Sequence, residues 1–352
     1  MKKKIILFIG PIAPPYGGIS IHIERLSILL EEDFHSDYID ESKNIKQEYF
    51  NIRSLNLFTY LKKILASDVL YIHSGNSLLR AFHVAVGSLM GRKTILTLHA
   101  YPFNKLKAVK LLEETIYGRA TRIILVNENL HEKIQLPRSK CLVRNAFLPP
   151  VMKTEPELPE TVNSWLVKSR LDGKFVFCAN AWQLEIFNNE DLYGADLCIE
   201  AVKKLIDRQL KVAMVFNVAS LDKFKDVYDN YQATIVKLGL DDSFLLINEK
   251  MSFVKLIEKS DIVLRPTNTD GDALTIREAL FLGKPVIASD VVNRPEGTLL
   301  FQNRNVEDLA DKIADTINQY DKPGMKHKYE NGEGYHSFYK QLLDGVINHH
   351  HS

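Results

Sequence analysis

Short apolar runs alternate with amphipathic segments along the whole chain. The first run, residues 5–9 (IILFI), is uninterrupted, which is typical of a strand buried on both faces of a parallel sheet. The segment after it places Ile23, Leu26 and Leu30 on one helical face. Strand and helix patterns continue to alternate, and such alternation predicts parallel sheets joined by right-handed helical crossovers.

The same patterns locate the remaining elements. We expect strands at 68–73, 93–98, 122–126, 140–144, 174–178, 212–217, 244–247, 262–265, 286–288 and 299–301. We expect helices at 19–30, 77–90, 106–117, 129–134, 197–210, 221–238, 253–259, 273–282, 306–317 and 334–346. No short repeat and no low-complexity tract interrupts the series.

A proline-rich segment divides this series into two similar halves. Residues 147–162 contain Pro149, Pro150, Pro156 and Pro159, and we interpret them as an interdomain linker. The sequence therefore predicts an α/β protein with two Rossmann-like domains facing each other across a cleft, where a ligand would bind. We expect domains at 1–155 and 156–332, and a terminal helix at 333–348 that packs back towards the first domain.

Composition and charge narrow the class of protein. A chain of 352 residues is long enough for two cores, and its 45% hydrophobic and 25% charged residues are ordinary for a globular protein. Its three cysteines form no CxxC pair, which argues against a disulfide scaffold or a zinc site. The composition therefore indicates a globular protein of a reducing compartment.

Charge is distributed unevenly along the chain. Residues 1–150 contain 21 lysines and arginines against 13 acidic residues, and the remainder contains 24 against 31. The basic half is either an ordinary solvated surface or a surface attracted to an anionic membrane or acceptor. We expect no nucleic-acid partner.

No segment is long and apolar enough to span a membrane, and the apolar run after Lys4 is too short for a signal peptide. We expect a cytoplasmic protein, with peripheral contact to the inner face of the membrane as an option. The histidines at 349–351 resemble an expression tag and are excluded from site reasoning.

Polar residues gather where the predicted strands of the first half end. Gly17 and Gly18 precede a helix, where glycine allows a phosphate or sugar to approach the backbone closely. His73 and His99 each follow a strand, and His99 could bond a sugar hydroxyl or hold a charge. A plain turn explains the glycines equally well, and a lone histidine at such a place is more often structural.

Residues 265–290 (RPTNTDGDALTIREALFLGKPVIASD) hold the densest group of candidate residues. They read as the end of a strand, a polar loop, a short helix stopped by Gly283, and another strand. Asp270 lies before the helix and Glu278 on it, so one carboxylate could hold a sugar and the other a ribose. The loop follows the carboxyl end of a strand, where ligands bind in open α/β sheets.

This stretch resembles the signature of retaining, nucleotide-sugar-dependent glycosyltransferases of family 4, which have the GT-B fold. Four other segments are similar to the family, although each is weak alone. They are the glycine loop PPYGGIS, the strand ILTLHAY, the hinge stretch LVRNAFLPP and the segment LGLDDSFLLINEK. The resemblance extends over nearly the whole chain.

The resemblance implies a role for each matching residue. Glu278 would accept hydrogen bonds from the ribose hydroxyls, and Asp270, where the family usually has Glu, would hold hydroxyls of the donor sugar. His99 would lie at the reacting end of the sugar, which makes His99 and Asp270 the catalytic candidates. The other donor-binding positions are Gly17, Gly18, Asn248, Met251, Ala273, Leu274 and Thr275. Backbone amides and cations would replace a metal ion, so no metal and no cofactor are expected.

Two cations of the family pattern are missing. Residues 178–182 (CANAW) contain no Arg, and Tyr193 stands where the family has Lys. Each lost donor at a developing dianion lowers the rate by roughly 10²–10³. Arg265, Arg277 or Arg294 could replace them, the phosphates could rest on amides, or the protein could bind without turnover.

The resemblance implies a retaining, metal-independent hexosyltransferase. It would use a nucleotide diphosphate sugar, with a UDP-sugar as the first choice, and a saccharide or lipid-linked saccharide acceptor. A role in cell-surface polysaccharide or glycolipid synthesis fits. The alternative is a weak or inactive sugar-nucleotide-binding subunit of the same fold. An epimerase or phosphorylase of that fold is a third class.

Overall fold

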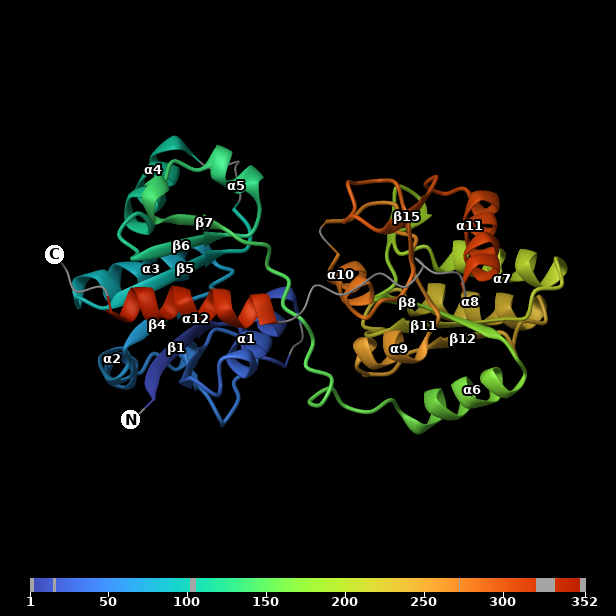
Figure 1. Ribbon diagram of the computed structural model, residues 1–352, viewed down its shortest axis with the longest axis horizontal. Coiled ribbons are helices and arrows are strands. Elements are labelled where there is room, and N and C mark those ends of the chain that lie inside the picture. The colour runs from blue at the N-terminus through green and yellow to red at the C-terminus, as the bar shows by residue number, and fades with distance from the viewer. Residues whose placement is uncertain (1–2, 15–16, 102–105, 272, 321–332, 349–352) are drawn as a thin grey trace. The chain divides into compact units, whose positions relative to one another are not determined.

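Figure 1 shows a computed structural model of the chain, which describes residues 3–14, 17–101, 106–271, 273–320 and 333–348, except for the side chains of Asn129 and Glu333. The chain forms two compact units. Unit 1 comprises Met1–Leu148 with Asn331–Ser352, and unit 2 comprises Pro149–Glu330. Each unit is an α/β layer structure around its own parallel sheet.

The sheet of unit 1 has the strand order β3-β2-β1-β4-β5-β6-β7, and every pairing in it is parallel. Its strands are β1 (Lys4–Gly10), β2 (Phe34–Asp40), β3 (Phe50–Asn51), β4 (Val69–Ile72), β5 (Lys93–Leu98), β6 (Arg122–Leu125) and β7 (Cys141–Val143). The central strands β1, β4 and β5 are buried along most of their length because both of their faces are covered.

Helices cover both faces of this sheet (Figure 1). One face packs against α1 (Gly18–Leu29) and α12 (Glu333–Asn348), whose Leu26 and Leu343 are fully buried. The other face packs against α2 (Leu57–Ala66), α3 (Ser77–Leu89), α4 (Lys107–Tyr117) and α5 (Glu128–Lys133). The terminal helix thus completes the core of unit 1, although about 180 residues of unit 2 precede it in the chain.

Unit 2 repeats the same plan with the strand order β12-β11-β8-β13-β14-β15. Its strands are β8 (Phe175–Ala181), β11 (Val212–Val218), β12 (Phe244–Ile247), β13 (Ile262–Arg265), β14 (Val286–Ser289) and β15 (Thr298–Phe301). One face packs against α7 (Ala195–Asp207), α8 (Lys225–Lys237) and α11 (Val306–Gln319), and the other against α6 (Glu160–Leu171), α9 (Phe253–Lys259) and α10 (Leu274–Phe281). A two-stranded hairpin of β9 (Ile186–Phe187) and β10 (Glu190–Asp191) follows β8.

The structure confirms the predicted α/β class with two Rossmann-like parallel sheets. Some elements were not predicted, among them the short strands β3, β9 and β10. Strand β2 and helix α2 fall in the segment 31–67, where no element was predicted, and β2 reads as polar because only Phe34, Ile39 and Asp40 are buried. Helix α6 begins at Glu160, inside the predicted linker, because a proline such as Pro159 is compatible with a helix start.

The strand order determines where ligands can approach each sheet. In both units the order reverses beside the first strand, at β1 and β4 in unit 1 and at β8 and β13 in unit 2. Ligands bind outside the carboxyl ends of the strands at such switch points. In unit 2 this edge carries the segments 182–194 and 266–271, and in unit 1 it carries the segments 11–14 and 73–76.

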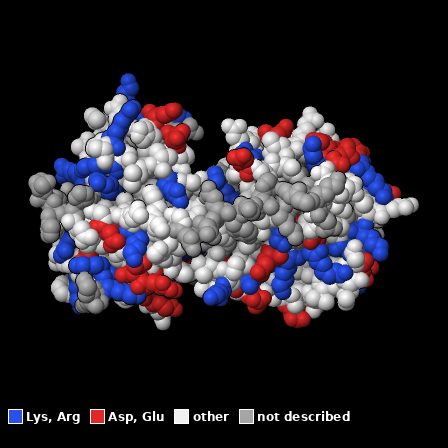
Figure 2. All heavy atoms as spheres, viewed as in Figure 1, with Lys and Arg blue, Asp and Glu red and all other residues white. Residues whose placement is uncertain are grey.

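Among the residues the structure describes, none of the helices combines the length and the apolar character that crossing a membrane requires. Basic and acidic side chains are interspersed over both units on the face shown in Figure 2.

The two loops at the switch point of unit 2 meet at Gly194. Gly194 has φ 72°, and a Cβ there would lie 2.3 Å from the carbonyl oxygen of Pro266. The Asn268 amide also donates to the Leu192 carbonyl oxygen at 3.0 Å. Only glycine combines this backbone conformation with so close an approach.

We therefore expect Gly194→Ala to lower the free energy of unfolding by about 3 kcal/mol or more, through left-handed strain plus overlap with Pro266. Gly173 is the matched control, because it also has φ 72° and an added Cβ would meet no atom within 4 Å. Gly173→Ala should cost about 1 kcal/mol. Urea unfolding of both variants measures the difference, and equal losses would mean that the contact with Pro266 is soft.

Candidate functional site

The loop after β13 is organised around Asp270. Its carboxylate accepts two hydrogen bonds from Arg265, Nε to Oδ2 at 2.9 Å and a terminal nitrogen to Oδ1 at 3.0 Å. Arg294, from the segment after β14, donates to Oδ2 at 2.7 Å. The structure thus brings three predicted site residues into one ion cluster.

Two hydroxyl groups complete this cluster. Thr267 Oγ donates to Asp270 at 3.1 Å, and Ser289 Oγ donates to the Thr267 carbonyl oxygen at 2.5 Å. Arg294 contacts both hydroxyl oxygens at 3.2 Å and donates from Nε to the Ser289 carbonyl oxygen. The loop is therefore tied to the end of β14 by a network in which the Arg294 and Asp270 side chains are 2% and 9% exposed.

The charges of the cluster affect the pKa of Asp270 and therefore the roles predicted for Asp270 and the two arginines. Burial by itself raises the pKa of Asp270, but hydrogen bonds and charge interactions with Arg265 and Arg294 outweigh it and lower that pKa. One carboxylate between two guanidinium groups leaves a net charge of +1. Asp270 is thus held by protein groups rather than presented alone to a sugar, and two of the three arginines proposed as phosphate cations, Arg265 and Arg294, contact it.

The short helix α10 begins directly after this loop. Ala273 is its N-cap, and Leu274 and Thr275 open its first turn with backbone amides that lack intrahelical acceptors. Thr275 Oγ donates to Asn180 Oδ1, at the end of β8, at 3.3 Å. Glu278 is 5% exposed on the same helix, and Arg277 is partly exposed.

The loop after β8 places Tyr193 beside the cluster. The Arg265 guanidinium lies over the Tyr193 ring, 5.5 Å from its centroid. Asp191 holds this loop by accepting bonds from the amides of Tyr193, Gly194 and Ala195. An arginine thus lies against the position where the resemblance would put a lysine, a contact that linear sequence could not reveal.

The segment after β12 holds the two residues expected to border a base. The Asn248 side-chain amide donates to the Val218 carbonyl oxygen at 2.7 Å, which ties the ends of β11 and β12 together. Met251 is partly buried and packs against the core beneath α9 and α10. Neither residue touches the Asp270 cluster through a described hydrogen bond.

In unit 1 the expected glycines lie at the start of α1. Gly17 is its N-cap, with an extended backbone, and its amide donates to Ser20 Oγ at 2.8 Å. A Cβ added at Gly17 or Gly18 would meet no described atom within 4 Å. The space above both residues is therefore open to a ligand, and neither glycine is required by a positive φ.

His99 belongs to a group of three histidines at the carboxyl edge of this sheet. His73 Nδ1 and His99 Nε2 are 3.2 Å apart, and His22 of α1 lies against both rings. Burial lowers the pKa of His22 to about 4 and holds those of His73 and His99 well below their usual value. The lowered pKa of His99 favours its neutral form, which can form hydrogen bonds through both ring nitrogens.

A buried arginine lies beside this group. Arg80 of α3 is 2% exposed, and its guanidinium donates to the carbonyl oxygens of Ser74, Gly75 and Ala100. Its charge contributes to lowering the pKa of His99. Sequence reasoning missed Arg80 because it lies on a helix without any motif around it.

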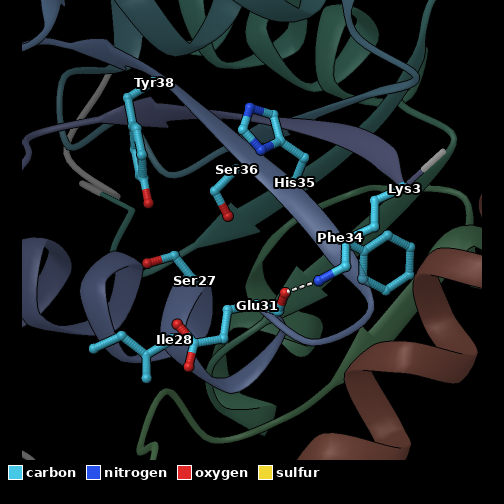
Figure 3. Close-up of a pocket in the computed structure, with 8 residues that line it drawn as sticks. All are labelled: Lys3, Ser27, Ile28, Glu31, Phe34, His35, Ser36 and Tyr38. Carbon is cyan, nitrogen blue, oxygen red and sulfur yellow. Dashed lines mark hydrogen bonds between the residues drawn. The ribbon is translucent and has the colours of Figure 1, made fainter.

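Two surface hollows of the described part of the chain lie away from these residues. Figure 3 shows one of about 320 Å³ between α1 and β2, where Lys3 donates to the Glu31 carbonyl oxygen at 2.6 Å. Another, of about 400 Å³, lies between α6 and α9. No predicted site residue lines either hollow, so the switch-point edges are the stronger candidates.

Comparison with known proteins agrees with this geometry. Residues 186–319 match the family model described as glycosyl transferases group 1. That span contains β13, the Asp270 cluster and α10. No curated protein matches the chain.

Solved structures match the whole chain at low identity. A glycosyltransferase from Rickettsia africae is 14% identical with a TM-score of 0.72, and the match covers 99% of this chain and 100% of that one. HepE from Anabaena in complex with UDP is 14% identical with a TM-score of 0.65, over 97% and 99%. MnaA from S. aureus, solved with UDP, is 15% identical with a TM-score of 0.62, over 100% and 99%. The fold is therefore the two-domain GT-B type of these proteins.

The cluster makes a prediction about Asp270. Asp270→Asn keeps the shape of the side chain but leaves two largely buried guanidinium groups without their carboxylate. We expect the free energy of unfolding to fall by about 3 kcal/mol, measured in urea at pH 7.

Asp229 provides the matched control, because it pairs with Lys225 on the exposed surface of α8. Asp229→Asn should change the free energy of unfolding by about 0.5 kcal/mol or less. An unchanged stability in Asp270→Asn would show that the cluster contributes little, and that Asp270 is available for a ligand.

Proposed function

We propose that the protein is a retaining hexosyltransferase, which moves a sugar from a UDP-sugar to a hydroxyl group of a saccharide or lipid-linked saccharide. The observation that carries this is Glu278, a buried carboxylate on α10 at the switch point of a sheet whose sequence matches group 1 glycosyltransferases. HepE has been solved with UDP and with UDP-glucose, and MnaA with UDP, which supports uridine as the base.

Donor binding follows from the residues around α10. Glu278 would accept hydrogen bonds from the two ribose hydroxyls, because a carboxylate suits a vicinal diol. The amides of Ala273, Leu274 and Thr275 at the start of α10 would hold the diphosphate, aided by the helix dipole. Asn248 and Met251 would border the base, at the end of β12.

The negative charge that develops on UDP as it departs would be stabilised by positive charge that the protein already holds near α10. The Arg265–Asp270–Arg294 cluster carries +1, and Arg277 lies on α10 itself. These groups and the amides would perform the work that a metal ion performs in other transferases, so we propose metal-independent transfer. Asp270 would then act as a positioning residue, which orients the two guanidinium groups.

The acceptor side belongs to unit 1. The open backbone at Gly17 and Gly18 would admit the phosphates or the acceptor. His99, being neutral, would bond a hydroxyl at the reacting end of the sugar.

A second candidate is a sugar-nucleotide-binding subunit with weak turnover or none. The observation that favours it is that Arg265 and Arg294 both contact Asp270, so neither is a bare cation. Incubation with UDP-, GDP- and ADP-sugars, with detection of released nucleoside diphosphate, separates the two functions. Binding without release or transfer across the panel would select the subunit.

Glu278→Gln tests the donor site. Removing the charge while keeping the shape should weaken UDP binding by roughly 10–100-fold, since a hydrogen bond to a charged group contributes about 1.5–3 kcal/mol. Isothermal titration with UDP measures this loss.

Glu200→Gln on the exposed surface of α7 is the control, and should bind UDP as the unmodified protein does. Unchanged UDP affinity in Glu278→Gln, with the fold verified by circular dichroism, would remove Glu278 from the site.

A lipid-linked acceptor would require contact with a membrane surface, and helix α4 suits that task. Leu106, Leu111 and Leu112 are 79%, 63% and 61% exposed, beside Lys107 and Lys110. Apolar side chains interleaved with lysines favour an anionic bilayer interface. The basic half of the chain also contains Lys2 and Lys105, which lie outside the described residues, and Lys3, Lys4, Lys62 and Lys63, none of which belongs to α4. We propose a peripheral protein of the inner membrane face that acts in cell-surface polysaccharide or glycolipid synthesis.

Leu111→Glu combined with Leu112→Glu tests this contact. The double variant should lose most of its binding to vesicles containing phosphatidylglycerol, because two apolar groups become anionic. Leu171→Glu, at an 84% exposed leucine of unit 2, is the control and should bind normally. Flotation or co-sedimentation measures the bound fraction, and equal binding of all three proteins would contradict a role for α4.

A further inference from the structure

Three histidines from separate elements of unit 1 converge on one point. His22 comes from α1, His73 follows β4, and His99 follows β5. Their ring centroids are 5.1 Å, 5.0 Å and 5.5 Å apart, so the rings form a nearly equilateral triangle. One ligand nitrogen from each ring lies within 4.8 Å of the others.

This triangle has the dimensions of a tetrahedral metal site. A Zn–N bond of about 2.05 Å places neighbouring ligand nitrogens about 3.3 Å apart and ring centroids about 5.2 Å apart. His73 Nδ1 and His99 Nε2 are already 3.2 Å apart. The most distant nitrogens would need to approach by about 1.5 Å at most, which side-chain rotation can supply.

Buried nitrogens without partners point to a ligand. His22 is 3% exposed and His73 is fully buried, and the Nε2 atom of each has no hydrogen-bond partner. Such atoms are expensive to bury, and each one in a folded protein calls for an explanation. A bound metal ion satisfies the His22 nitrogen directly.

The backbone fixes His22 in the form that a metal requires. Its Nδ1 lies 2.7 Å from the Ala146 carbonyl oxygen, which can only accept, so Nδ1 carries the proton. The lone pair is therefore on Nε2. Metal-binding histidines are held in this manner, with the second ring nitrogen donating to a carbonyl or carboxylate.

We propose that His22, His73 and His99 bind a divalent transition metal, with Zn²⁺ as the ion that fits best. Three neutral imidazoles suit zinc and leave the fourth tetrahedral position for water. The ion takes the place of the proton shared by His73 and His99. His99 is partly exposed, so solvent reaches the proposed metal site beside this residue.

Occupancy has a consequence that rests on the proposed function. His99 cannot bond a donor sugar while its nitrogen binds a metal. Zinc should therefore inhibit transfer, and a chelator should restore it. Binding is measured without any sugar, so a failure of the proposed transferase activity leaves the binding test intact.

The test uses the full chain with His349, His350 and His351 replaced by serine, so that these histidines bind no metal. This protein should bind one equivalent of Zn²⁺ by isothermal titration, and Co²⁺ should give the intense visible bands of a tetrahedral site. Its thermal unfolding temperature should rise with zinc. Absence of one-equivalent binding would overturn the proposal.

Two substitutions at one position identify the ligand. His22→Gln should weaken zinc binding by about 100-fold or more, whereas His35→Gln, at an exposed histidine of β2, should not change it. His22→Cys should keep the site and add a near-ultraviolet sulfur-to-cobalt charge-transfer band, which a purely structural residue would not produce. Tight binding in His22→Gln, or a His22→Cys protein that binds cobalt without that band, would sink the assignment.

Discussion

The ion cluster of Asp270 with Arg265 and Arg294 is the constraint on which the candidate donor site depends. The loop 266–273 must leave β13 and start α10 within a few residues, at a place where two other strands end. The carboxylate ties this loop to β13 through Arg265 and to the segment after β14 through Arg294. The opposing loop is held against it by Gly194, where only glycine fits. These contacts fix the loop that leads into α10, and Ile276 and Ala279 anchor the helix itself in the core of unit 2, so together they set the position of Glu278.

Burying polar side chains costs hydration free energy, and this cost is offset differently at the two sheet edges. In unit 2, charges are buried together, and hydrogen bonds between them compensate for lost hydration. In unit 1, the histidines are buried neutral, so little hydration is lost but nitrogens remain without partners. The first arrangement is complete as it stands and presents a net positive charge. The second arrangement is incomplete, and the proposed metal ion would give the His22 nitrogen the partner that it lacks.

Much of the fold followed from the sequence because parallel sheets leave a strong pattern. Strands such as β4 and β13 are buried on both faces and read as apolar runs, and their predicted bounds match the structure closely. The pattern failed at β2, a strand with several polar positions, and at α6, whose start is disguised by Pro159. Strand β2 has no periodic apolar pattern because it is only half-buried, and α6 has no clear start in the sequence because a proline caps it.

The site was harder to predict because its residues meet across the sheet rather than along the chain. Motif spacing could nominate Asp270, Arg265 and Arg294, but the sequence offered them as separate ligands for a sugar and a phosphate. Their mutual pairing depends on β13 and β14 being neighbours, which no local pattern encodes. The same holds for His22, which has no motif and meets His73 and His99 only because α1 covers the end of β4. The spacing of the three cysteines argues against a cysteine zinc site, but it says nothing of His22, His73 and His99, which are far apart in sequence and close in the fold.

The pairing of Asp270 with Arg265 and Arg294 also bears on the arginine and the lysine that the family pattern has and this chain lacks. If the resemblance is followed residue by residue, an absent arginine and an absent lysine argue against turnover. Charge, however, is a property of the whole site. Arg265 lies over the Tyr193 ring, at the position from which the lysine is absent, and Asp270 neutralises only one of the two guanidinium groups. A dianion leaving at the start of α10 would therefore still meet one uncompensated positive charge in a poorly solvated setting, where such a charge acts more strongly than in water. In the proposed transferase, turnover would then depend on how close that charge lies to the leaving oxygen, which makes the geometry of Arg265 more decisive than the number of arginines and lysines.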